Sequence, residues 1–358
     1  MESVAIVLFL AMIIAGFLFS RNKLVTVIMM IYIWIIIALN TASPDYASYE
    51  MIYKDPFSVY SVSTEIGYRM MGVLFSSLGF SYAQFRMVLA TIYVFLLANY
   101  IFRATTNRNI VFALMLISPT ILDISGIRSA IAYLIVMNFS LLLRNKTRKN
   151  TALFLLGVAL SCTFHTSAVF YIVLLMMDKK WTQRSAIRWI CVLLVVAVVL
   201  YSPLIKLIAN ALYAVTGYAK VLKWIGNETI KPNLTGIFSV AIFEIMYAVM
   251  ATYENKYIVK KEGRTTKHYA NINVMYILLM ALNVIATESR RLMCGSLIIK
   301  HSLTANTVGT ESHRINRKAL IYLSVQILIT ALQLWMYTYS YKSHDVFETL
   351  YKNMIFGG

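Results

Sequence analysis

The sequence predicts an all-α membrane protein, a polytopic bundle of transmembrane helices with about 12 passes, within a range of roughly 10 to 14. Of the 358 residues, 59% are apolar and only 13% are charged, about half the charged share of a soluble globular protein. Apolar stretches of near-bilayer length recur from end to end, beginning with residues 4–20 and 24–40. The longest polar stretches, each too short to fold alone, are 41–64, 203–233, 254–268 and 300–318. We therefore expect one integral-membrane domain over residues 1–358.

The net charge of +18 is carried largely by short loops between the apolar segments. Cytoplasmic loops carry an excess of Lys and Arg, so the basic loops predict the cytoplasmic side and leave both termini outside. No basic soluble domain carries the charge, which argues against a nucleic-acid partner and for the lipid bilayer as the main surroundings. The basic loops contain Arg21 and Lys23; Arg103 and Arg108; Arg144, Lys146, Arg148 and Lys149; Lys179, Lys180, Arg184 and Arg188; Lys256, Lys260, Lys261, Arg264 and Lys267; and Arg314, Arg317 and Lys318.

This orientation constrains two further segments. Residues 66–82 are apolar, but a crossing there would put the basic loop 144–149 outside, so we expect a helix lying at the outer interface. Residues 151–177 lie between two cytoplasmic loops and must enter and return, although two full crossings need about 40 residues. A polar turn at membrane depth is tolerated where it lines a wet cavity or is buried in protein. We therefore expect a short polar hairpin that lines an outward cavity, with His165 near its floor.

Ionisable and aromatic side chains at the predicted outer ends of the passes make a candidate site. Any single arginine among them could be an interfacial anchor, because its long side chain can reach the membrane surface. Several arginines on the side that the positive-inside rule leaves poor in Arg point instead to an anion site. The planar guanidinium suits phosphate because it forms two parallel charge-assisted hydrogen bonds. The candidates are Asp45, Tyr49, Glu65, Arg86, Asp123, Arg128, Arg290 and Arg291.

His165 is the candidate for proton transfer. A lone membrane histidine is often only an interhelical hydrogen-bonding group. This one lies in the polar centre of a hairpin that is too short for two crossings, which favours a functional role. A neutral imidazole can accept a proton near neutral pH.

Neither a metal nor a cofactor is expected. The three cysteines, Cys162, Cys191 and Cys294, show no C-x-x-C spacing and lie in or beside apolar segments. The chain contains no P-loop and no G-x-G-x-x-G motif for a nucleotide.

Several short motifs follow one another in an order that resembles a bacterial family. Each motif is weak alone, and their order across most of the chain carries the likeness. They are D-Y-x-x-Y (Asp45, Tyr46, Tyr49), E-x-G-Y (Glu65, Gly67, Tyr68), I-R-x-x-I-A (Ile127, Arg128, Ile131, Ala132), F-H-x-S-A (Phe164, His165, Ser167, Ala168) and an arginine before the late crossings (Arg290, Arg291). With these motifs the chain resembles the EpsG family, a branch of the Wzy-type polysaccharide polymerases.

The resemblance implies a metal-independent glycosyltransferase that joins oligosaccharide repeat units carried on undecaprenyl pyrophosphate. Such enzymes extend O-antigen, capsule or exopolysaccharide at the outer face of the bacterial cytoplasmic membrane. Expected partners are a flippase of the Wzx type and a chain-length regulator, besides the lipid-linked substrate and the bilayer.

The resemblance and the chemistry of the residues together give each candidate a role. His165 would take the proton of the acceptor hydroxyl, and Arg128 would lead the contacts to the donor pyrophosphate. The remaining assignments are Asp45 and Glu65 as alternative bases or sugar ligands, Arg290 and Arg291 as partners of Arg128 on the pyrophosphate, Arg86 as a second phosphate contact, and Tyr49 and Asp123 as further substrate contacts.

Other classes stay open. A flippase would move the same lipid-linked units, but flippases tend to have pseudo-symmetric halves, and no such symmetry is found in the sequence. An O-antigen ligase usually carries a large outer loop late in the chain, and the only candidate is the modest stretch 203–233. A membrane acyltransferase is the remaining alternative among enzymes.

Overall fold

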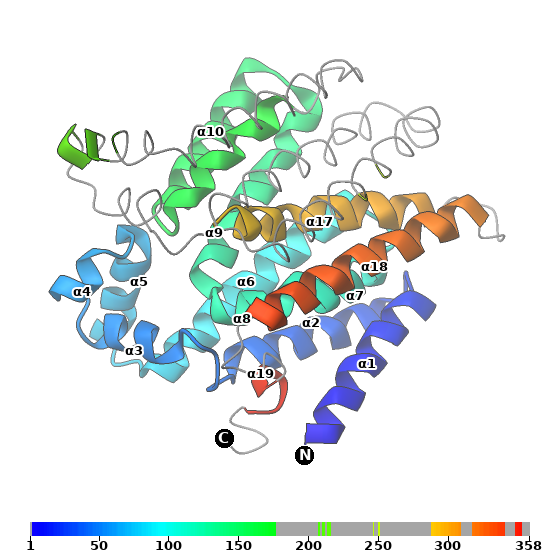
Figure 1. The fold of residues 1–358 in the computed structure, drawn as a ribbon, viewed down its shortest axis with the longest axis horizontal. Helices are drawn as coiled ribbons and strands as arrows, with labels where there is room; N and C mark the ends of the chain where they lie inside the picture. The colour runs from blue at the N-terminus through cyan, green and yellow to red at the C-terminus, as the bar shows by residue number, and fades with distance from the viewer. Residues whose placement is uncertain are drawn as a thin grey trace. The chain divides into compact units, whose positions relative to one another are not determined.

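In the computed structural model, every regular element of the described residues is a helix, and the all-α prediction is confirmed there (Figure 1). Residues 1–175 and 294–358 form one compact unit, and residues 176–293 form another. The prediction of a single domain stays a prediction. The basic loops 179–188 and 254–267 and most of the predicted outer loop 203–233 lie outside the described residues. The structure describes residues 2–176, 288–308, 317–340 and 348–352, with single positions between 207 and 250.

Helices of very different length build the first unit. Within the described residues, three stretches are long and apolar enough to cross a membrane, namely Tyr82–Ala104, Arg108–Ser125 and Ile127–Asn145. The total of about 12 passes therefore stays a prediction. The helices are α1 (Glu2–Leu18), α2 (Lys23–Ala38), α3 (Tyr46–Lys54), α4 (Val59–Val62), α5 (Ile66–Ser77), α6 (Tyr82–Ala104), α7 (Arg108–Met115), a π-helical turn (Leu116–Thr120), α8 (Ile121–Ser125), α9 (Ile127–Ser140), a 3-10 helix (Leu141–Asn145), α10 (Arg148–Cys162), a second 3-10 helix (Thr166–Met176), α17 (Glu288–Val308), α18 (Arg317–Ser340) and α19 (Glu348–Tyr351).

Local sequence sets where several helices begin. The Asn22 side chain accepts hydrogen bonds from the backbone N–H groups of Leu24 and Val25, which caps α2. Ser81 and Gln84 exchange side-chain and backbone hydrogen bonds at the start of α6, a capping box. Gly79 has a φ of +82°, a left-handed conformation that lets the chain leave α5 and enter α6.

Cations gather at one end of the unit, exposed at Arg21 and Arg103 and half-buried at Arg144, and we call this the basic end. The Arg144 guanidinium donates to the backbone carbonyl of Arg103 over 2.9 Å. Arg21 donates to the side-chain oxygen of Asn107 over 2.8 Å. Three of the basic loops predicted to share one side therefore lie together. That this side faces the cytoplasm stays a prediction.

The segment 151–177, predicted as a hairpin, reverses its direction in the structure, and its entry into the membrane stays a prediction. α10 ends at Cys162, the chain reverses over residues 163–165, and a 3-10 helix runs from Thr166 to Met176. Lys146, before α10, donates to the carbonyl of Leu175 over 2.7 Å, so both legs meet at the basic end. A 3-10 helix rises about 2.0 Å per residue, so its 11 residues span about 22 Å, and so do the 15 residues of α10. The tighter winding of the return leg explains how 27 residues close the hairpin.

The segment predicted as an interfacial helix forms α5, which has 12 residues. That length covers about 18 Å, too short for a bilayer core of about 30 Å. Ile66, Met70, Leu74 and Leu78 are exposed at four-residue spacing, so one apolar stripe faces outward. Figure 1 places α3, α4 and α5 together beside the first turns of α6. Length and stripe both favour a helix that does not cross.

α17 differs from the sequence pattern. Residues 300–318 form a polar stretch in the sequence, yet residues 300–308 continue this helix, and Lys300 and His301 are fully buried. The backbone of Ser118 leaves the helical conformation between α7 and α8, and the Nε2 atom of His301 lies 3.0 Å from its carbonyl oxygen. Gln326 of α18 lies at the other ring nitrogen, 3.5 Å away. Polar residues fill this helix because a break in a neighbouring helix supplies partners for them.

Candidate functional site

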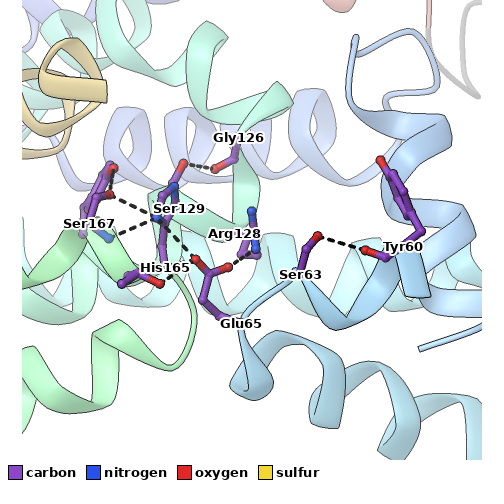
Figure 2. A network of polar contacts seen from close by, with 10 residues as sticks. Tyr60, Ser63, Glu65, Gly126, Arg128, Ser129, His165 and Ser167 are labelled. Atoms are coloured by element: carbon purple, nitrogen blue, oxygen red, sulfur yellow. Dashed lines mark hydrogen bonds and ion pairs between the residues drawn. The ribbon is translucent and has the colours of Figure 1, made fainter. Parts of the chain in front are cut away.

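Glu65 contacts Arg128 and the turn that carries His165 (Figure 2). Arg128 lies in the first turn of α9, at the opposite end of that helix from Arg144 of the basic end. One carboxylate oxygen accepts a hydrogen bond from the Arg128 guanidinium, which forms an ion pair. The other oxygen accepts from the backbone N–H of Thr166 over 3.1 Å and from its hydroxyl over 2.9 Å. The Glu65 side chain is only 8% exposed. We call this the site end and define it by Glu65, Arg128 and His165.

His165 lies beside Glu65 in the turn of the hairpin and is 6% exposed. Its Nδ1 atom is 4.0 Å from the carboxylate of Glu65 and 3.0 Å from the hydroxyl of Ser167. The Ser167 hydroxyl is in turn 3.1 Å from the hydroxyl of Tyr133, whose ring stacks on the imidazole at 5.8 Å. The backbone N–H of Ser167 also points at Nδ1, over 3.4 Å, and the direction of the bond to the Ser167 hydroxyl depends on the tautomer. In the tautomer with the proton on Nδ1, that atom donates to the Ser167 hydroxyl and faces the carboxylate. The lone pair that a general base needs is then on Nε2.

Gly67 brings Glu65 to this turn. Its backbone N–H donates to the carbonyl of Thr163 over 2.7 Å. A Cβ at Gly67 would lie 2.5 Å from the Thr163 hydroxyl oxygen and 2.8 Å from its carbonyl oxygen. No side chain fits there, so the glycine of the E-x-G-Y motif permits the close approach of α5 to the hairpin.

Two tyrosines flank the Arg128 guanidinium. Its central carbon lies 5.8 Å from the ring centre of Tyr49 and 6.0 Å from that of Tyr68, and the two rings lie 5.5 Å apart. These are cation–π distances. Burial raises the pKa of the Tyr68 hydroxyl well above its ordinary value, which keeps that group a hydrogen-bond donor. The motifs D-Y-x-x-Y and E-x-G-Y thus meet at the arginine of the I-R-x-x-I-A motif.

A second buried arginine, Arg86, lies in the second turn of α6. It is 2% exposed and donates through Nη2 to the carbonyl of Ile37 over 2.9 Å. Its guanidinium carbon lies 5.3 Å from the ring centre of Tyr46. Tyr46 and Tyr49 are three positions apart on α3, so one helix face covers both arginines.

Other predicted site residues lie elsewhere or outside the described side chains. The Asp123 carboxylate accepts a hydrogen bond from the Tyr93 hydroxyl over 2.7 Å, so it pairs with α6 rather than with Arg128. Asp45 is half-buried directly before α3, and its side chain does not cap that helix. Arg290 and Arg291 lie in the first turn of α17, and their side chains lie outside the described residues.

Sequence reasoning missed two members of this network. Thr166 is the variable position of the F-H-x-S-A motif, and only the fold reveals that it donates twice to Glu65. Tyr133 is one of the 24 tyrosines of the chain and lies in an apolar segment. No motif in the sequence distinguishes it from the others. In the described part of the chain, no group of three or more His, Cys, Asp or Glu side chains could hold a metal ion. Metal independence stays a prediction.

Comparison with known proteins agrees with the order of the motifs. No curated protein and no solved structure matches the chain. A sequence model described as the EpsG family matches residues 23–352, which is most of the chain. That match includes every predicted site residue and all the helices from α2 to α19. The chain therefore belongs to the EpsG family, and it is a membrane protein of polysaccharide biosynthesis with a glycosyltransferase-like, polymerase-type role.

Proposed function

We propose that this chain polymerises oligosaccharide repeat units carried on undecaprenyl pyrophosphate at the outer face of the bacterial cytoplasmic membrane. The observation that carries the proposal is the convergence of Glu65, Arg128 and His165 from three separate motifs. A base, a cation and a carboxylate that orients both are the groups that glycosyl transfer from a pyrophosphate donor requires.

In the proposed reaction the acceptor hydroxyl oxygen forms a bond to the anomeric carbon of the donor sugar. The bond from that carbon to the pyrophosphate oxygen breaks, and undecaprenyl pyrophosphate leaves with the electron pair. The acceptor proton goes to Nε2 of His165, and the site arginines stabilise the negative charge that develops on the leaving group. The transition state is oxocarbenium-like, as in other glycosyl chemistry.

Glu65 acts in this scheme as a positioning residue, and the base role falls to His165. Both of its oxygens accept hydrogen bonds, one from Arg128 and one from Thr166. A carboxylate engaged in this way is a weak base, because the hydrogen bonds favour its charged form. It stabilises the imidazolium that forms when His165 takes the proton, since Nδ1 lies 4.0 Å away.

The depth of the hairpin supports a site that opens outward. Each leg spans about 22 Å, less than the hydrocarbon thickness of about 30 Å. With the basic end at the cytoplasmic face, the turn that carries His165 ends below the outer membrane surface. Irregular backbone at that depth is tolerated where it borders a polar, protein-lined space, which is where lipid-linked sugars would enter.

The test is polymerisation by the purified full chain in lipid nanodiscs that contain undecaprenyl-pyrophosphate-linked repeat units. We expect a ladder of products on a gel, together with release of undecaprenyl pyrophosphate. Movement of the units across proteoliposomes without any ladder would replace the proposal with a flippase. Transfer of one preformed chain to a lipid core acceptor, without a ladder, would make the protein a ligase.

A further inference from the structure

Arg86 is a buried cation that lacks a counter-ion among the described residues. It is 2% exposed, and no carboxylate of the described chain lies within ion-pair distance. Its Nη2 atom donates to the Ile37 carbonyl, but Nε and Nη1 are buried without a hydrogen-bond partner. Buried charges in proteins are normally paired and hydrogen-bonded, because desolvation of a bare charge is costly. Two unused donors on a buried guanidinium therefore indicate an absent acceptor.

Arg128 presents the opposite case. Its Nη1 atom is paired with Glu65, so much of its charge is already compensated within the fold. Of the two arginines, Arg86 consequently offers an incoming anion the larger uncompensated charge. This difference in charge compensation could not be predicted from the sequence, because both arginines lie near the start of an apolar helix.

Two buried tyrosine hydroxyls lie within electrostatic range of the Arg86 guanidinium. Tyr82 is 5% exposed, and its buried hydroxyl lies within hydrogen-bonding range of the Arg86 guanidinium. Tyr68 is 1% exposed, its hydroxyl lacks a partner, and it lies within electrostatic reach of both Arg86 and Arg128. Nε and Nη1 of Arg86 and the hydroxyl of Tyr68 are buried without a hydrogen-bond partner, and the Tyr82 hydroxyl lies beside them. A set of donors next to a cation matches the oxygens of a phosphate-type anion.

We propose that Arg86, Tyr68 and Tyr82 form the principal oxyanion subsite of this protein, and that its ligand is a phosphate-type oxyanion. Arg128 is then a positioning residue that fixes Glu65 beside His165. The inference rests on the proposed function, in which the oxyanion is the pyrophosphate of the donor lipid. The ligand enters past Tyr46, the half-buried ring that lies over the guanidinium of Arg86.

A purely structural role for Arg86 is the competing explanation, because its bond to Ile37 caps the C-terminal end of α2. The full chain in detergent is therefore followed by thermal unfolding, without ligand and in titrations with undecaprenyl pyrophosphate or inorganic pyrophosphate. Arg86→Met should bind both probes at least about tenfold more weakly, because charge-assisted hydrogen bonds are lost. Its ligand-free unfolding temperature should not fall, since the variant removes an uncompensated charge.

Two further variants separate the explanations. Arg128→Met should unfold at a lower temperature without ligand, because it leaves the buried Glu65 carboxylate without its cationic partner. It should weaken ligand binding less than Arg86→Met does. Arg86→Lys keeps a donor for Ile37 but loses the planar fork, so it should keep stability and still bind weakly. Arg144→Met at the basic end is the matched control and should bind like the wild type.

Wild-type binding by Arg86→Met together with a lower unfolding temperature would overturn the subsite and leave Arg86 as a helix cap. Full recovery of binding in Arg86→Lys would overturn the forked contact. Inorganic pyrophosphate that binds through Arg86, without binding of the lipid, would uphold the subsite and contradict the proposed donor. A wild-type chain that binds neither probe would overturn both proposals.

Discussion

The two ends of the helical unit use cationic side chains in opposite ways. At the basic end, Arg21 and Lys146 are exposed and donate to an amide oxygen and a backbone carbonyl. At the site end, Arg86 and Arg128 are buried or nearly so and lie against tyrosine rings. Exposed ion pairs and hydrogen bonds contribute about 0 to 1 kcal/mol, whereas breaking one partner from a buried pair costs about 3 to 5 kcal/mol. We therefore expect the exposed basic loops to set the orientation in the membrane and the buried arginines to take part in the chemistry.

The experiment with the largest expected effect is cysteine labelling from outside the cell, which tests whether the two ends lie on opposite sides of the membrane. A cysteine at the exposed position Ala47, close to the site end, should be modified by a membrane-impermeant reagent added outside. A cysteine at the exposed position Thr147, in a basic loop, should be spared. Both are made in a background without the native cysteines, and permeabilised cells should show labelling at both positions. The reverse pattern would place the site end in the cytoplasm and end the outer-face mechanism.

The second experiment tests whether His165 is the general base. His165→Ala should lower the polymerisation rate by about 10² to 10⁴, the usual worth of general base catalysis. His165→Gln should be equally impaired, because glutamine can make hydrogen bonds but cannot take the proton. Ladders are compared at equal amounts of membrane-inserted protein. A normal ladder from either variant would return His165 to a structural role and pass the base role to Asp45.

A third experiment compares one substitution at both ends. Arg128→Lys keeps the charge but removes the Nη1–H donor that pairs with Glu65, so activity should fall on the order of tenfold, since each charge-assisted hydrogen bond is worth about 1.5 to 3 kcal/mol. Arg144→Lys makes the same change where the guanidinium only contacts a loop carbonyl, and activity should hardly change. Equal losses of activity from the two variants would mean that the arginines of the site end and of the basic end do not differ in function.

The smallest expected effect concerns the approach of α5 to the hairpin. Gly67→Ala would place a Cβ 2.5 Å from Thr163, so the two segments must separate and stability should fall by about 1 to 3 kcal/mol. Gly72→Ala on the same helix meets only Tyr53, at an ordinary contact distance of 3.5 Å, and serves as the control. Thermal unfolding and polymerisation are measured for both. An unaffected Gly67→Ala would mean that Glu65 is held by its own bonds alone.

Much of the fold followed from patterns that are local in the chain. The reversal over 151–177 was predictable because 27 residues cannot cross twice. A short helix at α5 was predicted because a crossing there would put the basic loop 144–149 outside, and its place at the membrane interface stays a prediction. The site was predictable only as a set of candidates at one end. Asp123 belonged to that set by its position, and its pairing with Tyr93 could not be read from the sequence.

The sequence by itself determined that this protein is helical and apolar, which loops are basic, and which motifs carry Glu65, Arg128 and His165. Only the tertiary structure decided that Glu65 pairs with Arg128, 63 residues away, and with Thr166, 101 residues away. It also decided that Arg86 is left uncompensated and that the polar face of α17 is buried. The physical reason is range: hydropathy and capping act within a few turns of a helix, whereas the partner of a buried charge depends on which distant helices pack against it.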